Sequence, residues 1–176
     1  MPQHFAVYIT LFRMNIAARI LCCLAMAALV SAAAANEYPE GKQKWLVLER
    51  QGARFPEIVT VLATLPAPEV RAKFPVLLQV SWGYAPLANG LPTEEEIVRG
   101  RDLYANLDRI FGQGGIYAMS RTGAGGRTMY YYVANPGSHA EALRQYFDSL
   151  SPISVKVTKH SDPEWNSVRE VLNGVK

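Results

Sequence analysis

The sequence predicts an α+β domain in which two helices cover one face of an antiparallel sheet. Between residues 76 and 159 the apolar pattern follows the order strand, helix, strand, strand, helix, strand. Both expected helices begin at capping-type residues, Thr93 and Ser138, and a glycine-rich segment joins the two middle strands. Strand–helix–strand crossovers are right-handed, so two of them place both helices on the same face. This arrangement is the ferredoxin-like sandwich.

A β-hairpin is expected in front of this core. Residues 45–50 and 58–65 are rich in branched and bulky apolar side chains, and the segment between them contains Gly52 and Pro56. Such a pattern is typical of two antiparallel strands joined by a turn.

Residues 76–84 alternate between apolar and polar side chains, which predicts a half-buried strand. Gln79 and Ser81 face the side opposite to the apolar set, which consists of Val76, Leu78, Val80 and Trp82.

The first core helix is expected to begin after Thr93. Thr93 and Glu96 have the spacing of a capping box, and residues 94–96 place three carboxylates at the positive end of the helix dipole. Neighbouring helical residues project about 100° apart, which favours capping over a cation site or an acid/base pair. Apolar positions recur at helical spacing until Phe111, where a glycine-rich stretch ends the helix.

The second half of the core repeats this plan. Residues 116–121 and 128–134 read as strands joined by a hairpin at 123–126; an anion-binding nest beside Arg127 is the alternative, but it lacks a following helix and lysine. Ser138 and Glu141 predict a second capping box, and 153–158 a final strand. Asp162 is expected to cap a terminal helix with Pro163 at its first position and Trp165, Val168 and Leu172 on its buried side.

The first 35 residues are typical of a secretory signal peptide. Arg13 and Arg19 precede the apolar run 20–30, and small residues follow it up to Ala35. We expect cleavage near Ala35, with an uncleaved anchor as the alternative and Met14 as a second candidate start. The predicted organisation is a signal peptide with an upstream extension (1–35), a linker (36–44) and one domain (45–176), exported to the periplasm or secreted.

The composition of the expected mature chain excludes several kinds of site. Cys22 and Cys23 lie within the signal segment, so disulfides, thiol catalysis and cysteine-based zinc sites are excluded. Sixteen basic and fifteen acidic residues remain, a net charge of +1, which argues against binding nucleic acid or anionic lipid by charge. His139 and His160 are expected at the surface, and neither a metal nor a cofactor is expected.

Three short motifs carry a family resemblance. Gly90-Leu-Pro92 precedes the acidic helix start, Gly126-Arg127 precedes a tyrosine-rich strand, and Asp162-Pro-Glu-Trp165 stands near the end. In this order the chain resembles the bacterial domain-of-unknown-function 695 family over residues 45–172. The resemblance implies a fold similar to that of the protein regulators of ribonuclease E activity. It implies no catalytic or binding residues.

The surface most suited to binding is the sheet face opposite the two helices. Strand alternation places Tyr131 under the helices and turns Tyr130 and Tyr132 to the other face. The candidate ligand-binding residues are Gln79, Tyr117, Arg121, Tyr130, Tyr132 and Lys156. The alternative is that these tyrosines pack across the strands or lie under the amino-terminal hairpin.

The leading functional hypothesis is a non-enzymatic binding module that engages a protein or a small polar ligand. One alternative is a small hydrolase or transferase with a serine or carboxylate site assembled near Arg99, Arg101 and Arg121. Another is an inhibitor or immunity-type protein that blocks a partner enzyme. The sequence indicates neither the partner nor the oligomeric state.

Overall fold

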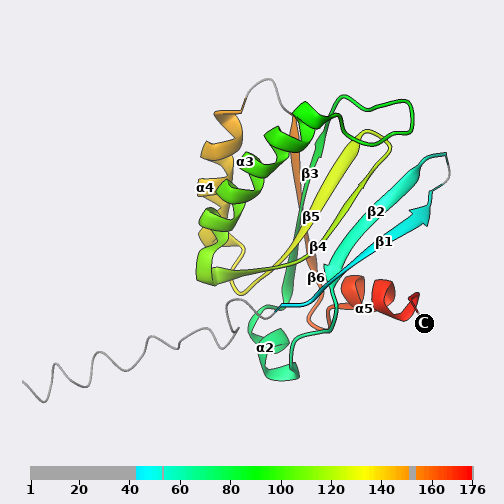
Figure 1. Cartoon of the computed structure of the whole chain (residues 1–176). Helices are drawn as coiled ribbons and strands as arrows, with labels where there is room; N and C mark the ends of the chain where they lie inside the picture. The colour runs from blue at the N-terminus through cyan, green and yellow to red at the C-terminus, as the bar shows by residue number, and fades with distance from the viewer. Residues whose placement is uncertain (1–42, 53, 151–153, 176) are drawn as a thin grey trace, which may run out of the picture. The chain divides into compact units, whose positions relative to one another are not determined.

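Six antiparallel strands form one sheet in residues 43–52, 54–150 and 154–175, the part of the chain that this computed structural model describes (Figure 1). The elements in chain order are β1 (Trp45–Gln51), β2 (Pro56–Leu62), α2 (Pro68–Lys73), β3 (Val76–Gly83), α3 (Glu94–Phe111), the 3₁₀ turn η1 (Gly112–Gly114), β4 (Gly115–Gly123), β5 (Gly126–Val133), α4 (Gly137–Asp148), β6 (Val155–Ser161) and α5 (Asn166–Asn173). The predicted α+β class is confirmed.

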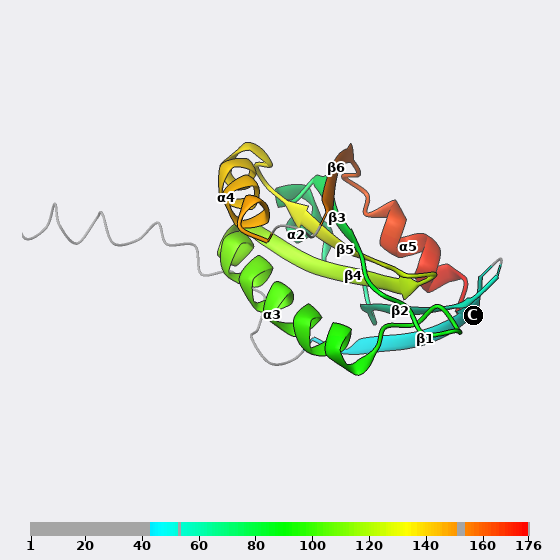
Figure 2. The same cartoon turned by 90° about the horizontal axis from the view of Figure 1, so that it is seen from above.

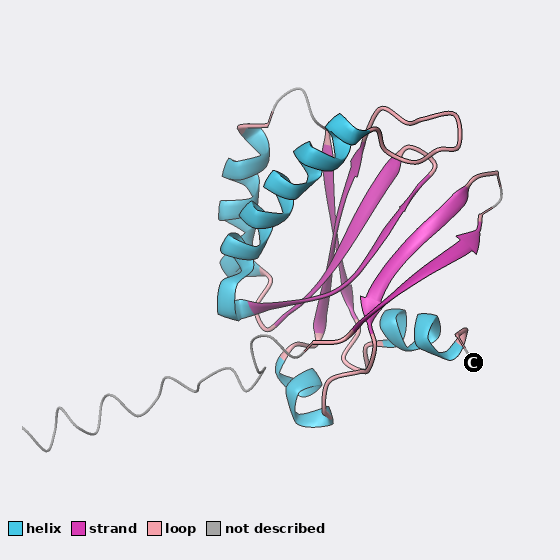
Figure 3. Ribbon diagram, in the orientation of Figure 1, coloured by secondary structure: helices cyan, strands magenta, loops and turns pink. Residues whose placement is uncertain are grey.

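The strands lie side by side in the order β1-β2-β4-β5-β3-β6. The predicted hairpin of β1 and β2 is confirmed, with Trp45 opposite Leu62 and Gln51 opposite Pro56. This hairpin extends the sheet because β2 pairs with β4. Figure 3 shows how the magenta strands form one continuous layer with the helices outside it.

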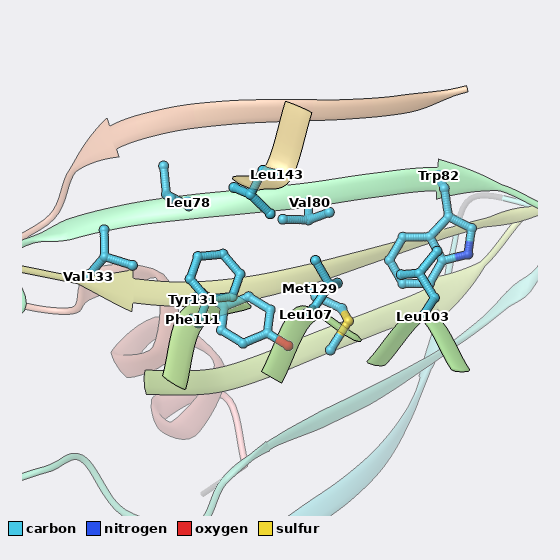
Figure 4. Packing of buried hydrophobic residues seen from close by; sticks show 10 residues of the cluster. All are labelled: Leu78, Val80, Trp82, Leu103, Leu107, Phe111, Met129, Tyr131, Val133 and Leu143. Carbon is cyan, nitrogen blue, oxygen red and sulfur yellow. The ribbon is translucent and has the colours of Figure 1, made fainter. Parts of the chain in front are cut away.

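Helices α3 and α4 cover one face of the sheet, as the two views in Figures 1 and 2 show. The core beneath them is drawn in Figure 4 and consists of Leu78, Val80, Trp82, Leu103, Leu107, Phe111, Met129, Tyr131, Val133 and Leu143. Tyr131 lies in this core as predicted, and its ring stacks on Phe111 with 4.1 Å between centroids. The alternation of β3 and β5 therefore selects the face that the helices bury.

Helix α5 covers part of the opposite face (Figure 2). Its anchor is Trp165, which is completely buried and stacks on Tyr132 with ring centroids 3.8 Å apart. The indole nitrogen of Trp165 also donates a hydrogen bond to the carbonyl oxygen of Phe74, at 3.1 Å. Burial of a large aromatic ring with a satisfied N–H group fixes the start of this helix to the sheet.

The start of α3 agrees with the predicted capping box in one of its two bonds. The hydroxyl of Thr93 accepts from the Glu96 N–H at 3.3 Å, whereas the Glu96 carboxylate accepts from the Ala85 N–H and pairs with Arg99. The Glu96 side chain thus ties the helix to the preceding loop instead of closing back on Thr93.

The predicted capping box at Ser138 and Glu141 is wrong. Helix α4 begins at Gly137, two residues before the start that a cap at Ser138 implies, and the Gly137 N–H donates to the side-chain oxygen of Asn135. The Ser138 hydroxyl donates to the Asn135 carbonyl oxygen, and Glu141 pairs with Arg144 further along the helix. Asn135 satisfies the first turn because its short amide reaches the backbone two residues ahead.

Asp162 caps α5 from outside the helix, which begins at Asn166 instead of Pro163. Its carboxylate accepts from the N–H groups of Asn166 at 2.7 Å and Ser167 at 3.0 Å. A left-handed turn at Trp165, where φ is +57°, brings these two N–H groups to the Asp162 carboxylate. The predicted cap is confirmed, but the turn shifts the helix start.

Three further differences concern segment bounds. Helix α2 was not predicted, because it has only six residues, begins at Pro68 two residues after Pro66, and buries none of its side chains. Strand β2 begins at Pro56 and ends at Leu62, short of residue 65. The predicted signal peptide (1–35), most of the linker (36–42) and Ile153 of the last strand lie outside the described residues.

Within the described residues, no helix combines the length and apolar character needed to cross a membrane.

Candidate functional site

A polar groove of about 520 Å³ opens on the part of the sheet face that α5 leaves uncovered. Its floor is a row of four residues in register across four strands: Arg121 of β4 opposite Thr128 of β5, Thr128 opposite Ser81 of β3, and Ser81 opposite Lys156 of β6. We call this set the polar row. It places a cation at each end and two hydroxyl groups in the middle.

The two hydroxyl groups of the polar row bind each other, with 2.9 Å between the oxygens of Ser81 and Thr128. A hydroxyl group has one donor and two acceptor positions, so this pair keeps one O–H donor and several lone pairs for another partner. Cross-strand pairs of this kind also stabilise the sheet.

Arg121 forms a two-pronged ion pair with Glu57 of β2. Its Nε and Nη2 atoms donate to the two carboxylate oxygens at 2.9 and 2.8 Å. Hydrogen bonding to Glu57, with a smaller contribution from Tyr130, outweighs partial burial and raises the pKa of Arg121. The Arg121 side chain keeps 43% of its surface exposed, against 25% for Glu57. Arg121 is therefore a permanent cation at the wall of the groove.

A second row lies one step further toward α5. Tyr130 stands opposite Gln79, and Gln79 stands opposite Thr158, whose hydroxyl donates to the Gln79 side-chain oxygen at 3.4 Å. A smaller cavity of about 300 Å³ lies between this row and α5, lined by Arg50, Gln79, Met119, Arg121, Tyr130, Ser167, Glu170 and Val171. Arg121 and Tyr130 line both cavities, so the two spaces border the same side chains.

Tyr132 lies in a third row that is buried, which corrects the expected exposure of this tyrosine. Its side chain is completely buried, its ring stacks on Trp165, and its hydroxyl donates to the Asp162 carboxylate at 2.7 Å. Tyr130 is on the predicted face but retains only 8% exposure. Trp165, directly before α5, stacks on Tyr132, whereas the alternative expected from the sequence is cross-strand packing of the tyrosines or cover by the amino-terminal hairpin.

The predicted position of Tyr117 on this face is wrong. Its ring packs against Tyr131 and stacks on Trp45, with centroids 5.4 and 5.0 Å apart, on the side of the sheet that carries α3. A register irregularity between Tyr117 and Met119 explains the difference. A β-bulge reverses the alternation on one side of it, so Arg121 and Tyr117 face opposite sides although they are four residues apart.

The end of the groove is formed by the glycines of the β4–β5 hairpin and of β3. Gly83, Gly123 and Gly126 line it, and Gly83 stands opposite Gly126. The predicted hairpin is confirmed. The alternative of an anion-binding nest does not hold for Gly125, because its N–H already donates to the Gly90 carbonyl oxygen at 3.0 Å. Because glycine has no side chain, these three positions leave the polar row open to solvent.

The two described histidines have different surroundings. His160 is exposed as predicted, whereas the expected surface position of His139 is wrong, because its side chain is buried beside Phe111. The Nδ1 atom of His139 lies 3.2 Å from the Ile110 carbonyl oxygen. Among residues 43–52, 54–150 and 154–175, no group of three His, Cys, Asp or Glu side chains is placed to hold a metal ion.

The structure brings together four of the six predicted site residues. Arg121, Tyr130, Gln79 and Lys156 lie on the open face, where they line one or both cavities, while Tyr117 and Tyr132 lie elsewhere. Sequence reasoning missed Glu57, because the strand was expected to begin at residue 58. An acidic residue directly before a β-branched run was the available signal.

Comparison with known proteins supports one assignment. Neither a curated protein nor a solved structure matches the chain. A family model described as a family of unknown function, DUF695, matches residues 43–172, which span all the strands and all but the last residue of α5. The resemblance expected from the three sequence motifs is thus confirmed, and the chain belongs to the DUF695 family.

Proposed function

We propose that this protein is a non-enzymatic binding module that holds a small polar ligand in the groove over the polar row. The groove volume of about 520 Å³ suits a small molecule, since ligand pockets range over about 300–1,000 Å³. The main support for this proposal is the polar row itself, which presents two cations and two hydroxyl groups in register on a sheet. Sites built on strands hold their groups more accurately than sites on loops.

The surroundings of the polar row favour binding over turnover. No histidine belongs to the described lining of the groove, and the one carboxylate in that lining, Glu57, is held by Arg121. The Ser81 and Thr128 hydroxyl groups are paired with each other, whereas a nucleophile needs a hydrogen bond to a base.

Two wider features belong to the same proposal. We place the core in the ferredoxin-like group, which the order β4-β5-β3-β6 and the position of α3 and α4 on one face support. We also propose that the protein works outside the cytoplasm, after removal of residues 1–35. The positive, apolar and small-residue order of that segment supports export.

A steric block of the groove tests the binding proposal. Gly83 lies opposite Gly126, and a Cβ atom at Gly83 meets nothing closer than the Gly125 carbonyl oxygen at 3.8 Å, so Gly83→Val fills the groove without a clash at Cβ. The assay is an NMR titration of the full chain with a panel of small polar compounds. Compounds that shift the Ser81 and Thr128 amide signals should lose this effect in Gly83→Val.

The matched control is Val47→Thr on the edge strand β1, where Val47 is 69% exposed and outside the groove. It should bind like the wild type. Conversion of a bound compound into product would refute the non-enzymatic assignment. Equal binding by Gly83→Val and the wild type would refute the groove as the site.

A further inference from the structure

The charge of the groove narrows the class of ligand that it fits. Its charged lining residues are three cations, Arg121, Arg127 and Lys156, and one carboxylate, Glu57. Arg127 is engaged away from the polar row: its Nε atom donates to the Thr122 hydroxyl at 2.7 Å, and its guanidinium lies over the Tyr104 ring. The cations left to meet a ligand are Arg121 and Lys156, at the two ends of the polar row.

The spacing of these two cations favours a ligand with two negative ends. Adjacent strands lie about 4.8 Å apart, so the Cα atoms of Arg121 and Lys156, three strands apart in one row, are separated by about 14 Å. Both side chains are long enough to reach inward over this distance. The Ser81–Thr128 hydroxyl pair lies between them and supplies hydrogen bonds to the middle of a ligand.

The ion pair of Arg121 shows which kind of anion its guanidinium binds. It holds the planar carboxylate of Glu57 through two parallel hydrogen bonds, which is the geometry that a guanidinium prefers with carboxylates. A guanidinium has five N–H donors, and the Glu57 pair uses two of them. The remaining donors suit a second carboxylate, and Glu57 is the group that competes with it.

We infer that the polar row binds a small dicarboxylate, with one carboxylate on Arg121, the other on Lys156 and the Ser81–Thr128 pair beneath the chain that joins them. This inference rests on the proposed binding function and specifies its ligand. Ring stacking is not the main contact, because Tyr130 is 92% covered by the protein itself, with 8% exposure.

The test is a titration of the full chain with glutarate, followed by NMR at low salt, with glutaramide as the uncharged compound of the same shape. Glutarate should shift the Ser81 and Thr128 amide signals, and glutaramide should not. Binding should weaken as salt is added, since exposed charges are screened. Inorganic phosphate is the second anion; binding as tight as that of glutarate would refute a preference for carboxylates.

Three variants of groove residues are expected to change the affinity for glutarate in opposite directions. Arg121→Met should weaken glutarate binding by about tenfold or more, the cost of losing a hydrogen bond to a charged group. Lys156→Met should weaken it by about two- to fivefold, as expected for an exposed ion pair. Glu57→Gln should tighten it, because the one negative charge of the groove is removed.

Lys159→Met is the matched control. Lys159 lies on the same strand as Lys156 but opposite Leu78, a residue of the core beneath α3 and α4, so it faces away from the groove. It should bind glutarate like the wild type. Should Arg121→Met fail to fold, Lys156→Met still tests the inference, because it replaces an exposed side chain.

The outcomes separate the ligand class from the binding function. Equal binding of glutarate and glutaramide, or an unchanged affinity in Lys156→Met, refutes the dicarboxylate. Binding of other polar compounds in the groove without any anion refutes the dicarboxylate and leaves the binding module standing. If Gly83→Val changes the binding of no compound, both proposals fail.

Discussion

Replacing Asp162 by alanine should destabilise the domain more than any other exchange of a single carboxylate in the described chain. Asp162 is 7% exposed and accepts three hydrogen bonds, from the N–H groups of Asn166 and Ser167 and from the hydroxyl of Tyr132. Loss of a helix cap costs about 0.5–2 kcal/mol. Leaving the buried Tyr132 hydroxyl without a partner adds about 1–3 kcal/mol. We expect a decrease of about 1.5–5 kcal/mol in the free energy of unfolding.

Urea denaturation of the wild type, Asp162→Ala, Tyr132→Phe and the double variant measures this value. Tryptophan fluorescence and far-UV circular dichroism should report one transition. The double variant should be more stable than the sum of the single losses predicts, because Tyr132→Phe removes the hydroxyl that Asp162→Ala orphans. A loss below about 0.5 kcal/mol in Asp162→Ala, or strict additivity, would refute the reasoning.

The same carboxylate gives the stability a pH dependence. Burial alone opposes its charge, but the hydrogen bonds from Tyr132 and from the backbone of Ser167 and Asn166 outweigh burial and lower the pKa of Asp162 below 3.8. A carboxyl whose pKa is lowered by folding stabilises the protein above its unfolded pKa and loses this effect as the pH falls through the folded pKa. The stability difference between the wild type and Asp162→Ala should therefore shrink below about pH 4.

Three further predictions concern the rest of the domain. Thr93→Ala should cost about 1 kcal/mol by removing the cap that accepts from Glu96, measured by urea denaturation, and an unchanged midpoint would contradict it. Gly90→Ala should cost more than about 1 kcal/mol, because φ is +80° and its Cβ would lie 2.7 Å from the Phe55 ring; thermal melting checks this, and an unaltered melting temperature would count against the strain. Burial raises the pKa of Tyr104 to about 12, so stability should fall as the pH rises above 10. Because burial also raises the pKa of Tyr131 and Tyr132, absorbance at 295 nm should show a late-ionising group of tyrosines, and Tyr104→Phe should reduce its amplitude by one tyrosine; an unchanged amplitude would contradict this.

The secondary structure was largely predictable because period and caps are local signals. The strand alternation at 76–83 and the Thr93 cap depend on neighbours within four residues, and both are confirmed. Helix α2 was not predicted because it is short and buries none of its side chains, so it has no apolar stripe. The start of α4 was misplaced because Asn135, Ser138 and their neighbours offer competing caps, and only the backbone path selects one.

The candidate site depended on long-range contacts that a periodic pattern does not contain. Strand alternation placed Arg121, Tyr130 and Lys156 on one face, but nothing local indicated that Trp165 would cover Tyr132. The bulge before Met119 likewise altered the face of Tyr117, since bulges leave no fixed residue signature.

The position of β3 has a consequence for how the chain reaches its native state during synthesis. Both hydrogen-bonded neighbours of β3, the strands β5 and β6, follow it in the sequence, and Arg50 of β1 binds the Val171 carbonyl oxygen 121 residues away. A nascent chain that ends before residue 155 has β3 as an open edge and no Trp165 to cover Tyr132. The sheet therefore reaches its full width, and Tyr132 its stacking partner, only once residues 155–165 have been synthesised.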